Sequence, residues 1–102
     1  MPRNHLAVLK ALSDPLRLQI LELLAQQQSC TCHLVSETGA RQANVSMHLR
    51  VLREAGLVES EKIGRNHYYR IRPGALEQVG GRLISLAKVS KAAPRDLRPA
   101  CP

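Results

Sequence analysis

The chain has 102 residues, which is enough for one domain with a hydrophobic core but not for two. Hydrophobic residues make up 44% of the composition and charged residues 23%, which excludes a disordered tail. The 15 Lys and Arg against 8 Asp and Glu give a net charge of +7, which predicts a polyanionic partner.

With two tyrosines and no Trp or Phe, the chain is poorly suited to stacking the bases of single-stranded nucleic acids. Three cysteines, an odd number, argue against a secreted disulfide scaffold. The sequence shows neither the apolar segment of a signal peptide nor the run of about 20 apolar residues that spans a bilayer. We therefore expect a cytoplasmic protein with no membrane partner.

Hydrophobic spacing predicts four helices in the first half of the chain, beginning with residues 4–12. The second helix follows Asp14-Pro15, because Asp is a strong N-cap and Pro is tolerated at the first helical position. The third runs from about Cys30 to Glu37 and closes at Gly39, where glycine can adopt the left-handed conformation. The fourth opens at residues 41–42 and stops at Gly56.

The sequence of the second half of the chain predicts a β-hairpin followed by one more helix. Residues 57–63 and 67–72 are typical of strands, and residues 64–66 of a three-residue turn. A last helix over residues 75–91 places Leu76, Val79, Leu83 and Leu86 at the spacing of a short coiled-coil seam. The domain is therefore expected to cover residues 1–92, and the basic, Pro-rich residues 93–102 to form a flexible tail.

The third and fourth helices, separated by a Gly-containing turn, predict a helix-turn-helix. The inner stripe of the fourth helix is apolar, and its leading outer side chains are short or hydrogen-bonding, as entry into a DNA major groove requires. The hairpin after it is typical of a wing. Residues 41–72 carry seven Lys and Arg against three Glu, a net charge of +4. The alternative is an ordinary small helical domain with a surface hairpin. The helix pair, the polar outer face, the wing and the local positive charge occur together, which favours a mostly α, winged helix-turn-helix protein that binds double-stranded DNA.

The residues expected to contact DNA lie on the outer face of the fourth helix and on the wing. Gln42, Asn44 and Ser46 suit base edges, whereas Arg50 and Arg53 suit phosphates. The full predicted set is Arg41, Gln42, Asn44, Ser46, Met47, Arg50, Arg53, Lys62, Arg65 and Asn66.

Residues 13–21 (Ser-Asp-Pro-Leu-Arg-Leu-Gln-Ile-Leu), 42–49, 52–58 and 64–70 closely resemble the ArsR/SmtB family, and the likeness covers about residues 5–90. The resemblance implies a homodimeric repressor that binds a palindromic operator and releases it when a metal or metalloid binds. It also implies a dimer interface between the first and last helices. The residues expected there are Leu6, Leu9, Leu76, Val79, Leu83 and Leu86.

The inducer site that the resemblance implies lies at the start of the third helix. The arsenite-type motif of the family reads Glu-Leu-Cys-Val-Cys-Asp-Leu-Cys. Cys30 and Cys32 match its first two cysteines, but Val35 replaces the third. Cys101 is either an idle thiol or a third ligand, from the same or the partner subunit. The family's other site, on the last helix, uses Asp and His, and no His follows His67 in this sequence.

Arsenite or antimonite, As(III) or Sb(III), is therefore the expected inducer. A divalent soft ion (cadmium, lead or zinc) and oxidation of the thiols are the alternatives within the same regulatory class. A small thiol enzyme or a metal chaperone is the alternative from a different class. A catalytic cysteine needs a positioned base, and only the adjacent His33 could supply one, so no enzyme activity is expected.

The spacing of the two cysteines also predicts a mechanism. Side chains two residues apart on a helix point about 200° from one another. Two sulfurs that hold one soft ion, each at about 2.3 Å, must lie within roughly 4 Å. We therefore expect ion binding to unwind the first turn of the third helix and to displace the fourth. The helix N-terminus also favours the thiolate, which is the form that binds soft ions.

Overall fold

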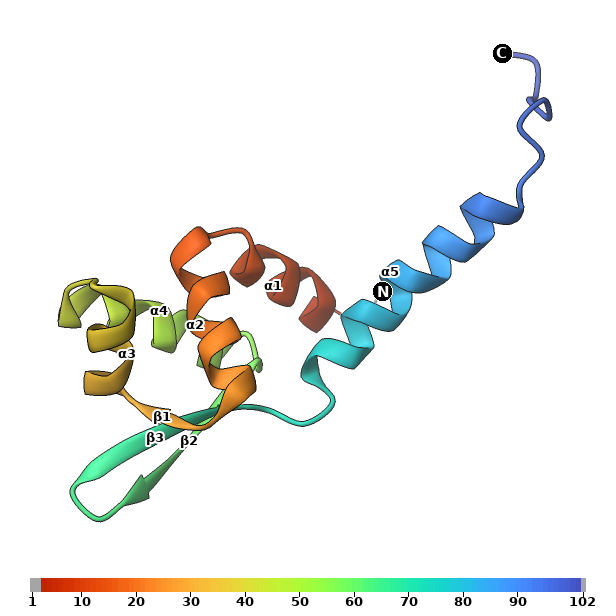
Figure 1. Cartoon of the computed structure of the whole chain (residues 1–102). Helices are drawn as coiled ribbons and strands as arrows, with labels where there is room; N and C mark the ends of the chain where they lie inside the picture. The colour runs from red at the N-terminus through yellow and green to blue at the C-terminus, as the bar shows by residue number, and fades with distance from the viewer. Residues whose placement is uncertain (1–2, 102) are drawn as a thin grey trace.

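The computed structural model describes the backbone of residues 3–101 and the side chains of residues 5–101. Five helices and a three-stranded antiparallel sheet make up the fold, so the predicted class, mostly α with a β-hairpin wing, is confirmed (Figure 1). In chain order the elements are α1 (Arg3–Leu12), α2 (Pro15–Gln26), β1 (Ser29–Cys30), α3 (Thr31–Thr38), α4 (Gln42–Glu54), β2 (Val58–Ile63), β3 (Asn66–Ile71) and α5 (Ala75–Ala92).

Local sequence signals set the helix ends. The carboxylate of Asp14 accepts a hydrogen bond from the backbone N–H of Arg17 at 3.0 Å and so caps α2, with Pro15 as its first residue. Gly39 closes α3 with a φ of 70°, and its N–H donates to the carbonyl of Val35 at 2.9 Å. Both predicted signals are therefore confirmed.

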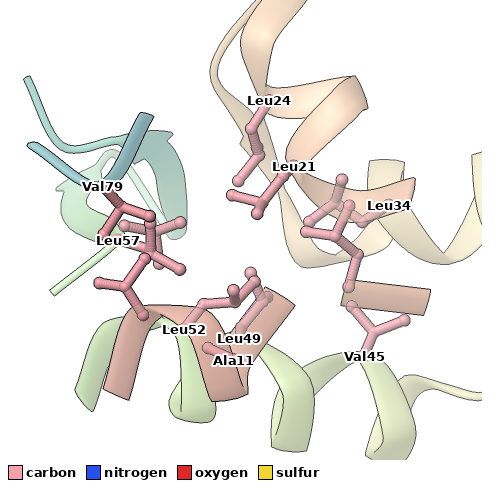
Figure 2. Packing of buried hydrophobic residues seen from close by; sticks show 12 residues of the cluster. Ala11, Leu21, Leu24, Leu34, Val45, Leu49, Leu52, Leu57 and Val79 are labelled. Carbon is pink, nitrogen blue, oxygen red and sulfur yellow. The ribbon is translucent and has the colours of Figure 1, made fainter. Parts of the chain in front are cut away.

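The hydrophobic core lies between α1, α2, α3 and α4, and it is closed by β2 and by the first part of α5 (Figure 2). Its fully buried large side chains are Ile20, Leu34, Val45, Leu49, Leu52 and Leu57. Val45, Leu49 and Leu52 all come from α4, so the predicted inner stripe of this helix is confirmed. Because that stripe is anchored in the core, the opposite face of α4 is held toward solvent.

The sheet has the strand order β1-β3-β2, and both pairings are antiparallel. The β2–β3 hairpin pairs Val58 with Ile71 at its base and Ile63 with Asn66 at its tip. The loop is therefore one residue shorter than expected, because Asn66 pairs within the ladder and Gly64, with a φ of 64°, makes the tight turn.

The strand β1 is not among the predicted elements. Its residue Ser29 pairs with Tyr69 and Cys30 pairs with Tyr68, so the backbone before α3 is held at the edge of β3. The third helix was expected to include Cys30, and this expectation is wrong. Cys30 has extended dihedral angles (φ −83°, ψ 166°) and is the N-cap of a helix that begins at Thr31.

Only the first turns of α5 pack against the rest of the chain, where Val79 is buried in the core. Every residue from Gly81 to Cys101 is exposed, and Figure 1 shows α5 and the following residues projecting away from the body. The molecule accordingly measures 62 × 24 × 23 Å. Within residues 3–101, none of the helices combines the length and apolar character needed to cross a bilayer.

Candidate nucleic-acid interface and thiol site

The outer face of α4 and the turn of the hairpin carry the side chains that sequence reasoning assigned to DNA. All ten of them are exposed: Arg41, Gln42, Asn44, Ser46, Met47, Arg50, Arg53, Lys62, Arg65 and Asn66. The N-terminus of α4 has no side-chain cap, so its first N–H groups stay available for an anion such as a backbone phosphate. This face therefore has the hydrogen-bonding groups and the positive charge that duplex DNA requires.

The hairpin neutralises its own acidic side chains. The guanidinium of Arg70 on β3 donates to Glu59 at 2.9 Å and lies 3.7 Å from a carboxylate oxygen of Glu61 on β2. These carboxylates raise the pKa of Arg70, mainly through the hydrogen bond with Glu59. Among the described side chains, no carboxylate lies within ion-pair distance of Lys62 or Arg65. Their charges are therefore available to a polyanion.

A partly buried polar contact connects α4 to the junction of α1 and α2. Arg17 donates from Nε to the carbonyl of Ala11 at 2.6 Å and from Nη1 to Nδ1 of His48 at 2.9 Å. Because a guanidinium can only donate, Nδ1 of His48 accepts and Nε2 carries the proton, 3.9 Å from Asp14. The backbone N–H of Arg17, more than any other group, lowers the pKa of Asp14. Sequence reasoning missed this contact because it joins residues 31 positions apart.

The thiols of Cys30 and Cys32 lie side by side, with 3.1 Å between their sulfur atoms. Cys30 stands outside the helix, so the rotation of about 100° per helical residue does not separate the two side chains. The premise that both cysteines lie on the helix is therefore wrong. Their sulfurs already lie within the distance that one shared ion requires, and α3 is helical from Thr31 onward.

The two thiols do not titrate alike. The pKa of Cys30 is lowered, chiefly by the hydrogen bond with the thiol of Cys32 and then by the backbone N–H of His33. The pKa of Cys32 is raised, chiefly by that same hydrogen bond and then by the charge of the Cys30 thiolate. Cys30 is therefore the first of the pair to become a thiolate, which is the nucleophilic and metal-binding form.

An open groove of about 260 Å³ joins the thiols to the DNA-facing side chains. It is lined by Cys30, Thr31, Cys32, Gln42, Arg65, Asn66, His67 and Tyr69. Two sites predicted separately, the thiol pair and part of the DNA-contacting set, are thus neighbours. Sequence reasoning gave His67 and Tyr69 no place here, because their position depends on the pairing of β1 with β3.

Cys101 lies apart from the other two cysteines. It is exposed, and Figure 1 shows the C-terminal residues beyond the far end of α5, away from β1 and α3. Over the described part of the chain, no three His, Cys, Asp or Glu side chains gather into a group that could hold a metal ion. Within one chain, the thiol donors at the groove are therefore Cys30 and Cys32.

The residues predicted for a dimer interface divide into three groups. Leu6, Leu83 and Leu86 are exposed, and Leu9 and Leu76 are half-buried. Val79 is 3% exposed and packs in the core of its own chain, so it is a core residue of the single chain. The apolar surface of α5 also includes Ile84 and Val89, which are 57% and 69% exposed.

Comparison with known proteins agrees with this arrangement. Residues 14–60 match the family described as bacterial regulatory protein, arsR family. An arsenical resistance operon repressor of Staphylococcus xylosus is 36% identical over 76 residues, which cover 74% of this chain and 73% of that one. A transcriptional repressor SmtB homolog of Synechocystis is 41% identical over 61 residues, which cover 60% of this chain but only 46% of that one.

Among solved structures, a winged helix-turn-helix DNA-binding domain from Mycobacterium bovis superposes with a TM-score of 0.67 at 38% identity. The match covers 87% of this chain and 79% of that one, which is described as homodimeric and as a possible ArsR-family transcriptional regulator. The helix-turn-helix, the wing and these similarities agree: the chain belongs to the ArsR/SmtB family, a family of DNA-binding transcriptional regulators and not of enzymes.

Proposed function

We propose that this regulator is a homodimeric repressor that leaves its operator when a thiophilic ion, arsenite or antimonite, binds Cys30 and Cys32. The proposal rests on the position of the two thiols in the structure. Their sulfurs lie 3.1 Å apart in a groove lined by the first residue of α4 and by the turn of the wing. An inducer held there touches the elements that read DNA.

Operator binding rests on the exposed face of α4, with the wing beside it. A winged helix-turn-helix places its recognition helix in the major groove, and a two-fold dimer places two of them on successive half-sites. The exposed leucines Leu83 and Leu86 on α5 and Leu6 on α1 supply apolar surface for such a dimer. The homodimeric relative from Mycobacterium bovis supports this assembly.

The elements that hold the two sulfurs connect the inducer site to the DNA-binding surface. Cys30 belongs to β1, which pairs with β3 of the wing, whereas Cys32 lies in the first turn of α3, which packs against α4. An ion shared by both sulfurs ties the wing sheet to α3 and takes up space beside Gln42 and Arg65. Release of DNA then needs a small shift of the wing relative to α4, and not an unwound helix.

The donor set favours a metalloid over zinc. Zinc in structural sites takes four N or S ligands, whereas the described chain offers two thiols at the groove. Soft thiolates suit trivalent arsenic and antimony, for which cadmium and lead are the closest divalent substitutes. Cys101, from either subunit, stays a candidate third ligand.

Thiol oxidation is a second candidate signal, because the sulfurs lie close enough for an attack of the Cys30 thiolate on an oxidised Cys32. Hydrogen peroxide would accept two electrons and two protons from the pair, giving one disulfide and two waters. The disulfide would occupy the same position between β1 and α3 as the ion.

The test is the fluorescence anisotropy of labelled operator DNA bound to the full-length protein during titration with arsenite, cadmium, zinc or peroxide. We expect arsenite to release the DNA at the lowest concentration. Cys30→Ser should abolish the response while leaving the affinity of the ion-free protein for DNA unchanged.

Cys101→Ser is the matched control, because it removes a thiol outside the groove. A normal arsenite response in this variant removes the tail from the site, and a lost response makes Cys101 a ligand. Release by peroxide alone would assign the site to oxidation. An unchanged arsenite response in Cys30→Ser contradicts the proposal.

A further inference from the structure

A second concave site lies between α1, the turn after α4 and the start of α5, and it shares no residue with the groove of the thiols. This pocket has a volume of about 160 Å³. One water molecule takes up about 30 Å³ in the liquid, so the pocket can hold a molecule several times larger than water. Its lining comprises His5, Val8, Ala55, Gly56, Arg72, Pro73, Gly74, Ala75 and Gln78. No Asp or Glu is among them.

His5 brings an unsatisfied polar atom to this pocket. Its Nδ1 is buried and has no hydrogen-bond partner among the described residues. A buried polar atom without a partner is costly, and native structures leave few of them. Neutral imidazole can carry its proton on Nδ1, and a rotation of the ring would present this atom to a ligand, because Nδ1 has almost no exposed surface in its present position. It is the only buried side-chain nitrogen or oxygen in the described part of the chain that is left without a partner.

Arg72, an exposed residue, adds a positive charge to the lining of the pocket. Its N–H donates to the carbonyl of Leu57 at 2.8 Å, which fixes the chain just after β3. Its guanidinium lies over Gly56, where an added Cβ would come within 3.6 Å of Nη1. Among the described side chains, no carboxylate lies within ion-pair distance of Arg72. A guanidinium offers planar paired donors that match an oxyanion.

The start of α5 completes the wall with further donors. Gly74 is the N-cap of this 18-residue helix, so no side chain caps its first turn, and the N–H of Ala75 donates to the backbone carbonyl of Arg72 at 3.2 Å. The positive end of the helix dipole therefore faces the pocket beside the amide of Gln78. Glu77, the acidic residue of this first turn, lines a different surface with Gly80 and Ile84.

We infer that this pocket binds a small tetrahedral oxyanion of the phosphate or sulfate class. Within the described residues, Nδ1 of His5 has no hydrogen-bond partner, Arg72 has no carboxylate within ion-pair distance and α5 has no side-chain cap, so an acceptor with negative charge would complement all three. The bound anion would join α1 and α5 to the turn that ends α4, and so fix the angle at which α5 leaves the body. The inference does not depend on the thiols.

Calorimetric titration of the full-length protein with inorganic phosphate, and separately with sulfate, tests the site at constant ionic strength set by chloride. We expect saturable binding of one anion per chain. Arg72→Gln should weaken it about tenfold or more, since charge-assisted hydrogen bonds are the strong ones. His5→Leu, which fills the space but cannot donate, should weaken it by a smaller factor.

Arg95→Gln is the matched control, because it removes one positive charge from an exposed residue beyond α5. Equal melting temperatures of the two Arg variants in chloride show that both are folded. Absence of saturable binding, or equal binding by Arg72→Gln and Arg95→Gln, overturns the inference. A pocket filled by a carboxylate from a second copy would instead show weaker dimerisation of Arg72→Gln and no anion binding, which also overturns it. Cys30→Ser should bind phosphate normally, so failure of either proposal leaves the other intact.

Discussion

The sulfur atoms of Cys30 and Cys32 share one hydrogen bond, and this contact makes the two thiols chemically different. The hydrogen bond lowers the pKa of Cys30 and raises the pKa of Cys32, as expected when the thiol of Cys32 is the donor and Cys30 the acceptor. A thiol pair of this kind offers one thiolate readily and a second with more difficulty. Reaction with a soft ion is therefore expected to start at Cys30 and to finish at Cys32.

Alkylation by iodoacetamide, followed by mass spectrometry at neutral pH, measures this difference. Cys32→Ala removes the donated hydrogen bond, so the pKa of Cys30 rises and its alkylation should slow about two- to tenfold. The reciprocal variant, Cys30→Ala, should speed the alkylation of Cys32, because the group that raises its pKa is gone. Cys101, exposed and distant, serves as the internal control. Equal rates for Cys30 in the native chain and in Cys32→Ala would show that the hydrogen bond has no effect on reactivity.

The helices of this chain start and end where short-range chemistry requires it, and most of the fold could therefore be predicted. Asp14-Pro15 and Gly39 act through hydrogen bonds and dihedral angles within a few residues of themselves. The apolar stripe of α4 likewise follows from helical spacing, and its anchoring in the core exposes the residues of α4 that are predicted to contact DNA.

The parts that could not be predicted all depend on contacts between distant segments. The strand β1 exists because it pairs with the edge of β3, where the partner of Ser29 is Tyr69, 40 positions away in the sequence. Once β1 forms, Cys30 leaves the helix, and the expected separation of the sulfurs disappears. The contact of Arg17 with His48 and the pocket at Arg72 have the same origin. No periodicity or local motif in the sequence indicates these long-range contacts.

The cap of α2 provides a test at the scale of one element. Asp14→Ala should lower the melting temperature by about 4–8 °C, because a helix N-terminus loses its acceptor. Asp14→Asn keeps an oxygen acceptor and loses only the charge, so its melting temperature should fall less. Calorimetric melts measure both variants.

The difference between the native chain and Asp14→Asn should depend on pH. The pKa of Asp14 is lowered in the folded chain from its ordinary value of 3.8, so the charge stabilises the fold above that value. This contribution is lost as the pH falls through the lower folded pKa. The gap in melting temperature should therefore be full at neutral pH and shrink below 3.8. A gap that widens in acid would show that the charge does not act through the cap.

The whole molecule is elongated because α5 continues well beyond its contacts with the core. Leu83 and Leu86 are 51% and 62% exposed, and Ile84 and Val89 are more than half exposed as well. A helix face of this kind buries apolar surface only when another chain covers it. Assembly and DNA binding are therefore expected to change together.

Leu86→Glu should shift the protein from dimer to monomer in sedimentation velocity, because a charge in an apolar interface is costly to bury. Its affinity for a two-half-site operator should fall by at least about tenfold, since one chain reads only one half-site. Ser85→Glu adds the same charge one position earlier, about 100° around the helix from Leu86, and should weaken both properties less. A dimeric Leu86→Glu would place the interface elsewhere on the chain.

The shared groove has a consequence for the order of events during a response. If the proposed function holds, a duplex bound to α4 and the wing would cover the thiols in the same groove, so DNA and inducer could not bind at the same time. Thermodynamic reciprocity then requires that the operator weaken uptake of the ion by the same factor by which the ion weakens the operator complex. Repressor that is not bound to DNA would take up the first ions. The rate of derepression would then be set by the rate at which bound repressor dissociates from its operator.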